Sequence, residues 1–148
     1  MTADGTAAPG GQRWGMMLKR AEQSLLRAKA VALEPAGLTL AQYVALCELE
    51  SQPGITGAAL ARACLVTPQA MMVVLKAMHE QGLVERTPHP RHANVLELHL
   101  TDVGREALSA ARRLVEPIEQ RLDEALPPAD AAVLTELLTR VITETEPR

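Results

Sequence analysis

The sequence contains no phenylalanine and only one tryptophan and one tyrosine in 148 residues. Sandwich and barrel cores are rich in aromatic and β-branched side chains, whereas the leucine, valine, alanine and methionine found here suit helix-on-helix packing. Two cysteines, Cys47 and Cys64, are too few for a disulfide framework, so we expect a cytoplasmic protein. No apolar run approaches the ~20 residues of a membrane-spanning helix, and no membrane partner is expected.

Charge is unevenly distributed, although the formal net charge is only −3. Residues 1–33 contain five basic and two acidic groups, and residues 101–148 contain six basic and ten acidic groups. The stretch 65–100 has three of each sign and all four histidines. Phosphate contact depends on local charge, and an acidic body keeps the remaining surface away from nucleic acid. The charge balance therefore neither establishes nor excludes DNA binding.

The N-terminal part predicts a disordered leader over residues 1–12, followed by a helix over 13–33. One face of this helix is apolar at steps of three and four residues, namely Leu18, Ala21, Leu25, Ala28 and Ala32. A second apolar row consists of Met17, Leu26 and Leu33. Because the helix is apolar on more than one side, we expect it to pack against more than its own chain.

Threonines mark the starts of four further helices. Thr39, Thr56, Thr67 and Thr101 are each expected to cap a helix, over residues 40–51, 57–64, 68–81 and 102–126. Pro117 should bend the longest of these helices, whose apolar stripe is Leu108, Ala111, Val115, Ile118 and Leu122. After Pro127-Pro128, a last helix is predicted over 129–143, with the face Leu134, Leu137, Leu138 and Val141.

A β-hairpin is predicted between the fourth and fifth helices. Its strands are expected over 83–87 and 95–100, joined by a loop over 88–94 that two prolines stiffen. In the second strand, Leu96, Leu98 and Leu100 alternate with polar or exposed positions, which predicts one buried and one solvated face.

The helix over 68–81 has two different faces. Met71, Val74, Leu75 and Met78 form its core face, and the opposite face presents Gln69, Met72, Val73, Lys76 and Glu80. A short helix, a tight turn and such a second helix match a helix-turn-helix, in which the first turns of the second helix meet base edges. Gln69 can pair with adenine, Lys76 with guanine or phosphate, and the apolar pair can contact a thymine methyl. Helix pairs of this kind are common in helical proteins, but the hairpin that follows completes a winged-helix order.

Residues 38–142 resemble the MarR family of winged-helix transcription regulators. The resemblance is carried by Leu60-Ala61, Gly82-Leu83-Val84, Arg86, Leu100-Thr101-x-x-Gly104-Arg105, and a tail from Leu126-Pro127-Pro128-Ala129-Asp130 to Val141. The chain departs from the family pattern in two places. The Asp and Arg-Arg of the usual wing are replaced by His92, Ala93 and Asn94, and the usual Thr and Arg of the recognition helix by Met72 and Val73.

The resemblance implies a mainly α fold with a small β-hairpin wing. It implies a helical dimerisation region over 13–37 and 102–146, and a winged helix-turn-helix lobe over 38–101. The expected function is a ligand-responsive repressor that binds a near-palindromic operator in double-stranded DNA as a homodimer. The alternative is a homodimeric protein–protein interaction module that keeps the fold without specific DNA binding. The expected DNA-contacting residues are Thr67, Pro68, Gln69, Met72, Val73, Lys76, Arg86, His89, Arg91, His92 and Asn94.

Other chemistry is less well supported by the residues. The four histidines have no cysteine or carboxylate at metal-finger spacing, so neither metal nor cofactor is expected. Cys47 and Cys64 lie among apolar residues and suit inert core filling better than oxidant sensing. No catalytic constellation is present, so an enzyme is not expected. The resemblance implies a small-molecule effector, such as an aromatic acid, in a cleft between the first helix and the DNA-binding lobe. The residues expected to line it are Trp14, Met17 and Tyr43, and for each of these packing in the core or dimer interface is the competing interpretation.

Overall fold

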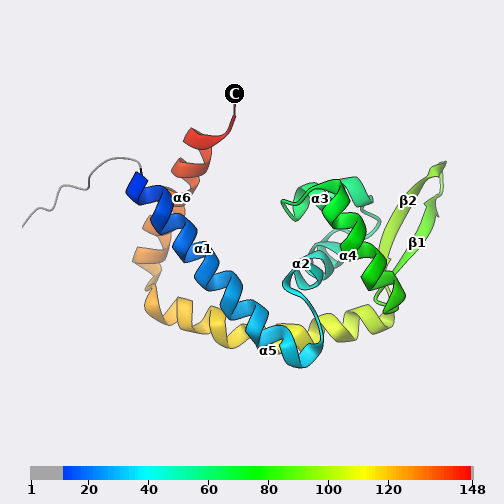
Figure 1. The fold of residues 1–148 in the computed structure, drawn as a ribbon, viewed down its shortest axis with the longest axis horizontal. Helices are drawn as coiled ribbons and strands as arrows, with labels where there is room; N and C mark the ends of the chain where they lie inside the picture. Colours follow the sequence, from blue (N-terminus) through cyan, green and yellow to red (C-terminus); the bar gives the residue numbers. More distant parts are fainter. Residues whose placement is uncertain (1–11, 148) are drawn as a thin grey trace, which may run out of the picture.

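The structure, a computed structural model, describes residues 12–147, so the predicted leader lies almost entirely outside it. Its elements are α1 (Gln12–Leu33), the 3-10 turn η1 (Glu34–Ala36), α2 (Leu40–Ser51), α3 (Gly57–Ala63), α4 (Pro68–Glu80), β1 (Val84–His89), β2 (His92–Leu100), α5 (Asp102–Ala125) and α6 (Pro128–Thr145) (Figure 1). The predicted mainly helical fold with a hairpin wing is confirmed, and every helix begins and ends within two residues of its expected bounds.

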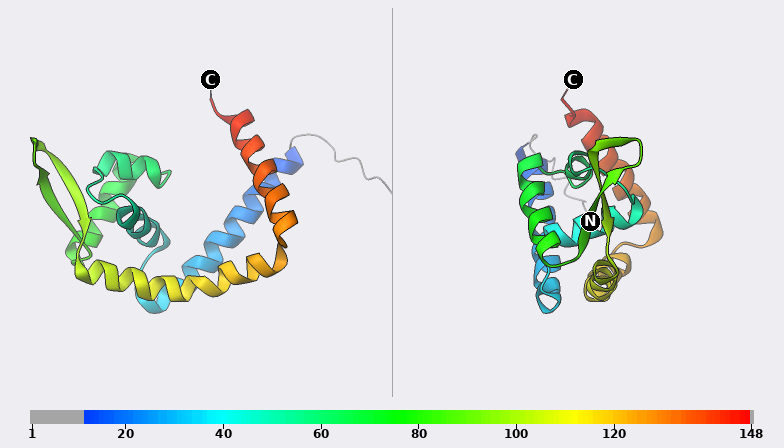
Figure 2. Two further views of the ribbon diagram at one scale, coloured as in Figure 1. Left: turned by 180° about the vertical axis from the view of Figure 1, so that it is seen from behind. Right: turned by 90° about the vertical axis from the view of Figure 1, so that its right-hand side faces the viewer.

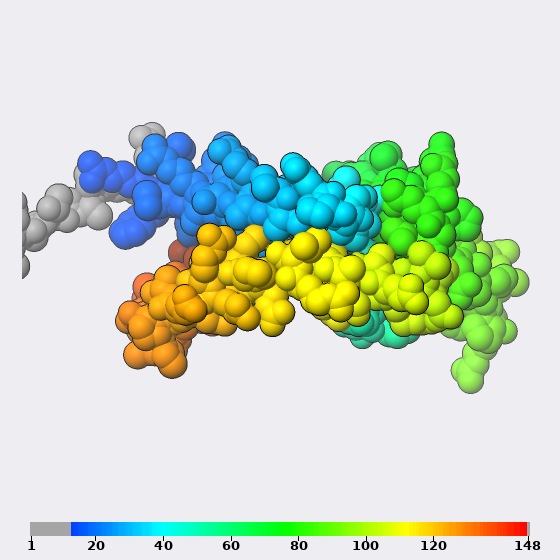
Figure 3. All heavy atoms as spheres, turned by 90° about the horizontal axis from the view of Figure 1, so that it is seen from below, coloured from blue at the N-terminus to red at the C-terminus, as the bar shows by residue number. Residues whose placement is uncertain are grey.

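The chain forms a lobe at one end and a helical arm at the other. Helices α2, α3 and α4 gather with the hairpin in the lobe, α1 and α6 form the arm, and the long helix α5 connects the two (Figure 1). Seen from behind, α5 is curved, and the hairpin projects from the outer end of the lobe (Figure 2). Helices α1 and α5 pack against one another and lie side by side across the lower face (Figure 3).

All four predicted threonine caps are present. The Oγ1 atoms of Thr39, Thr56, Thr67 and Thr101 each accept a hydrogen bond from the backbone N–H three residues later, at 3.0–3.3 Å. Each bond satisfies one of the backbone donors that a helix start leaves unpaired. The polar residue Gln42 is buried because its Oε1 accepts from the backbone N–H of Thr39 and its Nε2 donates to Gln81. It therefore ties the start of α2 to the end of α4.

The hydrophobic core lies inside the lobe and continues along α5. Each of the helices α1 to α5 contributes at least one completely buried large side chain to this core. These side chains are Leu33, Leu46, Leu49, Leu60, Met71, Met78 and Leu108. The absence of phenylalanine is compatible with this core because helices can pack through leucine and methionine alone.

The hairpin is longer and its turn tighter than predicted. The strands reach His89 and His92, so only Pro90 and Arg91 form the turn, and the expected loop over 88–94 is wrong. Strand β2 is paired on both sides, because Gly54 N–H donates to Leu98 O and Leu98 N–H donates to Ile55 O at 2.9 and 3.0 Å. Among the described residues β1 has no second partner strand, and a proline is tolerated at such an edge.

The expected burial of Leu96 is also wrong, since this side chain is 48% exposed. Leu98 and Leu100 are buried as predicted. Alternation along β2 puts Leu96 on the same face as Leu98 and Leu100, but Leu96 lies nearer the hairpin turn. The hairpin projects from the outer end of the lobe (Figure 2).

Helix α6 has no buried residue among those described. Its apolar face remains exposed, and so does Leu122 at the end of the predicted α5 stripe. On α1, Met17 and Leu26 are likewise exposed, although Leu33 is completely buried.

No single helix in residues 12–147 is long and apolar enough to cross a membrane. Two pairs of helices, each pair bent at the break between its members, meet the test of length and composition only when the two helices are counted together.

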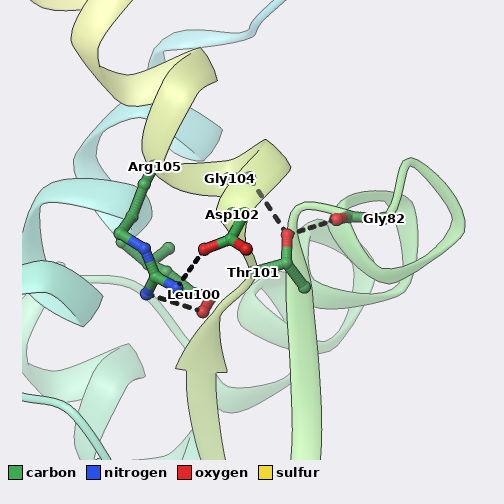
Figure 4. A network of polar contacts seen from close by, with 6 residues as sticks. All are labelled: Gly82, Leu100, Thr101, Asp102, Gly104 and Arg105. Atoms are coloured by element: carbon green, nitrogen blue, oxygen red, sulfur yellow. Dashed lines mark hydrogen bonds and ion pairs between the residues drawn. The ribbon is translucent and has the colours of Figure 1, made fainter.

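The junction between the lobe and α5 is built around Thr101. Its hydroxyl donates to the carbonyl oxygen of Gly82 at 2.5 Å and accepts from the N–H of Gly104 at 3.0 Å (Figure 4). Arg105 donates to the carbonyl oxygen of Leu100 and pairs with Asp102 at 2.7 Å. The end of α4, the end of β2 and the start of α5 are therefore held together at one point.

Candidate nucleic-acid interface

Helices α3 and α4 form the helix-turn-helix, and they are bent by 109° relative to one another. This angle lies in the ~90–120° range of such motifs. The turn between them contains Leu65, whose backbone φ is +57° and whose side chain is 92% exposed. A left-handed backbone is uncommon for any residue other than glycine, and here it lets the chain reverse within a few residues.

The predicted division of α4 into two faces is confirmed. Met71, Leu75 and Met78 are buried, whereas Met72 is 68% and Val73 72% exposed. Gln69, Met72, Val73 and Lys76 are spaced i, i+3, i+4 and i+7, so they form one continuous outer stripe. We call these four residues the outer stripe of α4.

The first turn of α4 is fixed by a cap at Thr67 and by Pro68. Thr67 uses its hydroxyl to cap the helix, through a 3.1 Å bond from the N–H of Ala70, and Pro68 occupies the first turn. Both residues therefore position the outer stripe. A helix start also carries a partial positive charge, which favours a nearby phosphate.

The outer face of α4 and the first strand border a shallow open depression of about 530 Å³. It is lined by Met72, Val73, Lys76, His79, Glu80 and Arg86. The structure thus brings three predicted α4 residues together with Arg86 of β1. Glu80 was predicted on this face but not as a DNA contact, and His79 was not predicted here, although its spacing of three residues from Lys76 indicates it.

The wing places Arg91 at the hairpin turn, with His89 and His92 on either side. The two imidazole rings are 5.2 Å apart, and the backbone N–H of Arg91 donates to Nδ1 of His89 at 3.0 Å. Arg91, His92 and Asn94 are all exposed. This tip is well separated from the exposed face of α4 along the chain, but both belong to the same lobe (Figure 1).

A contact missed in the sequence involves Glu97. Its two carboxylate oxygens lie 3.6 Å from Nε2 of His89 and 3.3 Å from Nε2 of His99. Because Nδ1 of His89 accepts the N–H of Arg91, a neutral His89 ring carries its proton on Nε2, where it faces Glu97. His89 is therefore engaged within the wing, and His92 is the freer of the two imidazoles at the tip. The register of the hairpin, which the sequence alone did not provide, brings Glu97 close to His89, whereas His99 lies two residues from Glu97 on the same strand.

The three expected effector-lining residues do not line one common depression of the described chain. Trp14 and Met17 lie near the start of α1, about 25–30 Å along the helix from Leu33, whereas Tyr43 lies against α5. Tyr43 instead lines a depression with Arg112, Val115, Glu116 and Glu119. Burial and the neighbouring Cys47 thiol raise the pKa of Tyr43 to about 12.

Ion pairs border this second depression. Arg112 pairs with Glu50, which lowers the pKa of that carboxyl and raises the pKa of the guanidinium. Lys29 pairs with Glu119 at 2.5 Å, linking α1 to α5. The depression therefore combines an aromatic ring, an apolar floor and a guanidinium at the place where α2 meets α5.

The cysteines and histidines form no metal-binding cluster in the described part of the chain. No group of three His, Cys, Asp or Glu side chains in residues 12–147 has a metal-binding arrangement. Both cysteines are half-buried, and burial raises the pKa of Cys64 to about 11. A thiol that stays protonated near neutral pH reacts slowly.

Comparison with known proteins connects this architecture to one family. The MarR family profile matches residues 36–93. The HTH-type transcriptional repressor Rv2887 of Mycobacterium tuberculosis is 36% identical over 108 residues, which cover 73% of this chain and 78% of that protein. The chain belongs to the MarR family. The prediction from its motifs is thus confirmed, and its winged helix-turn-helix is that of a DNA-binding transcriptional regulator.

Solved structures of MarR proteins superpose on nearly the whole chain. The repressor CouR bound to a 23-mer DNA duplex gives a TM-score of 0.78 at 30% identity, covering 86% of this chain and 90% of CouR. A mutant of MarR from E. coli complexed with operator DNA gives 0.79 at 27% identity, covering 86% and 92%. Rv2887 in complex with salicylic acid gives 0.69 at 32% identity, covering 92% and 98%.

Proposed function

We propose that this MarR-family protein is a cytoplasmic homodimeric repressor that binds a near-palindromic operator and releases it when an aromatic acid binds. The observation that carries the proposal is the outer stripe of α4, which is exposed at the second helix of a capped helix-turn-helix with a wing beside it. In proteins of this architecture the second helix enters the major groove and dimer symmetry sets the half-site spacing.

Residues 13–37 and 102–146 form the dimerisation region in this proposal. Helix α6 buries none of its described residues within the protomer, and its exposed large apolar side chains are Val133, Leu134, Leu137, Leu138, Val141 and Ile142. Trp14, Met16 and Met17 add an exposed apolar surface on α1. A face of this size in water favours association, at roughly 25 cal/mol per Å² of apolar area removed from solvent.

Sedimentation velocity tests the dimer. A species of twice 15.9 kDa at micromolar concentration is expected. Leu137→Asp should shift it toward monomer, because a carboxylate would have to be buried without a partner. Glu136→Asp, on the same helix, is the control. A folded 15.9 kDa species in the unsubstituted protein would refute the homodimer.

The effector site in this proposal is the depression beside Tyr43 and Arg112. An aromatic carboxylate could place its ring against Tyr43 and Val115 and its carboxylate against the Arg112 guanidinium, which suits planar anions. Support comes from Rv2887, which was crystallised with salicylic acid and with p-aminosalicylic acid.

Salicylate titrations test this part of the proposal. Salicylate should weaken binding to the operator, and Arg112→Gln should abolish that response while leaving DNA binding in place. Arg140→Gln is the matched control, because Arg140 also pairs with a glutamate but lies on α6. An Arg112→Gln protein with an unchanged salicylate response would exclude this depression as the site.

The DNA-contacting residues divide into two groups. Gln69, Met72, Val73 and Lys76 would face the major groove, held by Thr67 and Pro68 at the helix start. Arg86, His89, Arg91, His92 and Asn94 would approach the phosphates or minor groove from the wing. Gln69→Ala should weaken the cognate site roughly 5–150-fold while random DNA is less affected, corresponding to ~1–3 kcal/mol for a bidentate base contact. Equal affinity of Gln69→Ala and unsubstituted protein for the operator would remove Gln69 from the groove.

A further inference from the structure

The outer stripe of α4 has an unusual order of side chains for a groove-facing surface. A polar residue, Gln69, stands at one end and a cation, Lys76, at the other. Between them lie Met72 and Val73, which together present the apolar part of the depression on this face. From Gln69 to Lys76 the helix rises about 10 Å, a length that spans about three base-pair steps.

Neither apolar residue belongs to the buried core of the lobe. The core face of α4 is complete without them, since Met71, Leu75 and Met78 are already buried. Met72 and Val73 are more than two-thirds exposed and line an open depression beside Arg86 of β1. Their exposure is unfavourable in water, so a contact that removes it would contribute to binding.

The charges around the pair favour a nucleic-acid partner over an apolar protein surface. Lys76 and Arg86 border the depression, and the positive end of the helix lies at Thr67. Glu80, at the far end of the helix, would repel phosphate, so the first two turns are the part that can approach DNA most closely. In a major groove, the one apolar group that projects from a base edge is the 5-methyl of thymine.

We infer that Met72 and Val73 form an apolar clamp for a thymine 5-methyl group at the centre of each operator half-site. The inference rests on the proposed DNA-binding function and specifies what the site recognises. Val73 is β-branched and holds its methyl groups in one orientation on a helix, whereas Met72 is flexible and can close over the methyl from the other side. Cytosine would be rejected, because it lacks the methyl and its amino group would lose water without gaining an acceptor.

Replacing thymine by deoxyuridine tests the clamp directly, because the two bases differ only by the 5-methyl group and pair identically. The operator would first be selected from a random 30-base-pair duplex library. Substituting deoxyuridine at the central thymine should then weaken binding about fourfold in one half-site and about 15-fold in both.

Three variants connect the methyl effect to the clamp. Met72→Gln and Val73→Thr should each reduce the preference for thymine over deoxyuridine, because each weakens one apolar side of the clamp. Val103→Thr should keep the full discrimination, since Val103 is similarly exposed but lies on α5. A coupling between side chain and methyl measured in this way excludes effects that act on folding alone.

The outcomes separate the clamp from the proposed function. Selection of thymine-containing sites with a deoxyuridine penalty that is reduced in Met72→Gln and in Val73→Thr supports the clamp. Specific, salt-dependent binding with no deoxyuridine effect at any thymine would overturn the clamp and leave DNA binding intact. Failure to select any duplex sequence would overturn the proposed function, and the clamp with it.

Discussion

A β-carbon on Gly104 would lie 2.0 Å from the carbonyl oxygen of Leu83. The first turn of α5 therefore rests directly on the chain that leaves α4, with no room for a side chain. The same carbonyl accepts the N–H of Thr101 at 3.1 Å, so it cannot move away without losing a hydrogen bond. The lobe is thus fastened to the connecting helix by backbone contact.

Gly104→Ala should lower the free energy of unfolding by about 1–3 kcal/mol, because the backbone must shift to admit the methyl group. The loss exceeds the stabilisation of up to ~1 kcal/mol that alanine gives over glycine inside a helix. Gly15→Ala is the control, since Gly15 lies in α1 with nothing within 4 Å of its added carbon. Urea unfolding of both variants at the same protein concentration would measure the difference in their free energies of unfolding. If Gly104→Ala proved as stable as Gly15→Ala, the close approach would not exist in solution.

Thr101→Val should destabilise the protein by about 1–2 kcal/mol, since it removes the helix cap but keeps the side-chain shape. It also leaves the Gly82 carbonyl without the hydroxyl that donates to it. Thr143→Val is the control, because that hydroxyl only donates back to the carbonyl of Thr139 within exposed α6. Equal unfolding midpoints for the two variants would contradict this role of Thr101.

Cys64 should be slow to react with thiol reagents in the folded protein. Burial raises its pKa to about 11, so little thiolate forms at pH 8. Allowing for the greater nucleophilicity of a less acidic thiol, alkylation in a Cys47→Ala background should be about tenfold slower than in urea. The native state favours the protonated thiol, so this contribution to stability is present below pH ~8.5 and is lost as the pH rises toward 11. Equal alkylation rates in folded and unfolded protein would refute this account.

Arg91→Ala should weaken DNA binding and reduce the slope of log affinity against log salt by about one unit per half-site. Arg91 stands at the two-residue turn of the wing, where the family pattern has a pair of arginines nearby and this chain has Ala93 and Asn94. Arg91→Lys should retain the slope, because the charge is preserved. An Arg91→Ala protein with unchanged affinity and slope would show that the wing tip is only a solvated turn.

Local signals in the sequence were sufficient to predict the helices and the two faces of α4. Thr39, Thr67 and Thr101 mark helix starts because a capping hydroxyl acts within three residues, so no tertiary information is needed. The core face of α4 follows from helical periodicity, which places Met71 and Leu75 on one side whatever they pack against.

Features that depend on pairing between distant residues could not be predicted. The wing was expected to be a seven-residue loop because Pro88 and Pro90 usually interrupt strands, but β1 is an edge strand where proline is tolerated. The contact of Glu97 with His89 depends on the register of the hairpin. The depression beside Tyr43 likewise depends on how α2 meets α5, which periodicity does not specify.

The most direct test of the regulator account is binding to the intergenic DNA upstream of this gene, measured as a function of salt concentration. A dimer that inserts α4 and the wing into two half-sites should protect a near-palindromic footprint, and its log affinity should fall steeply with log salt. Excess random DNA should compete poorly. A folded dimer that leaves no footprint and binds this DNA without salt dependence or preference over random sequence would contradict the account and favour a protein–protein interaction module.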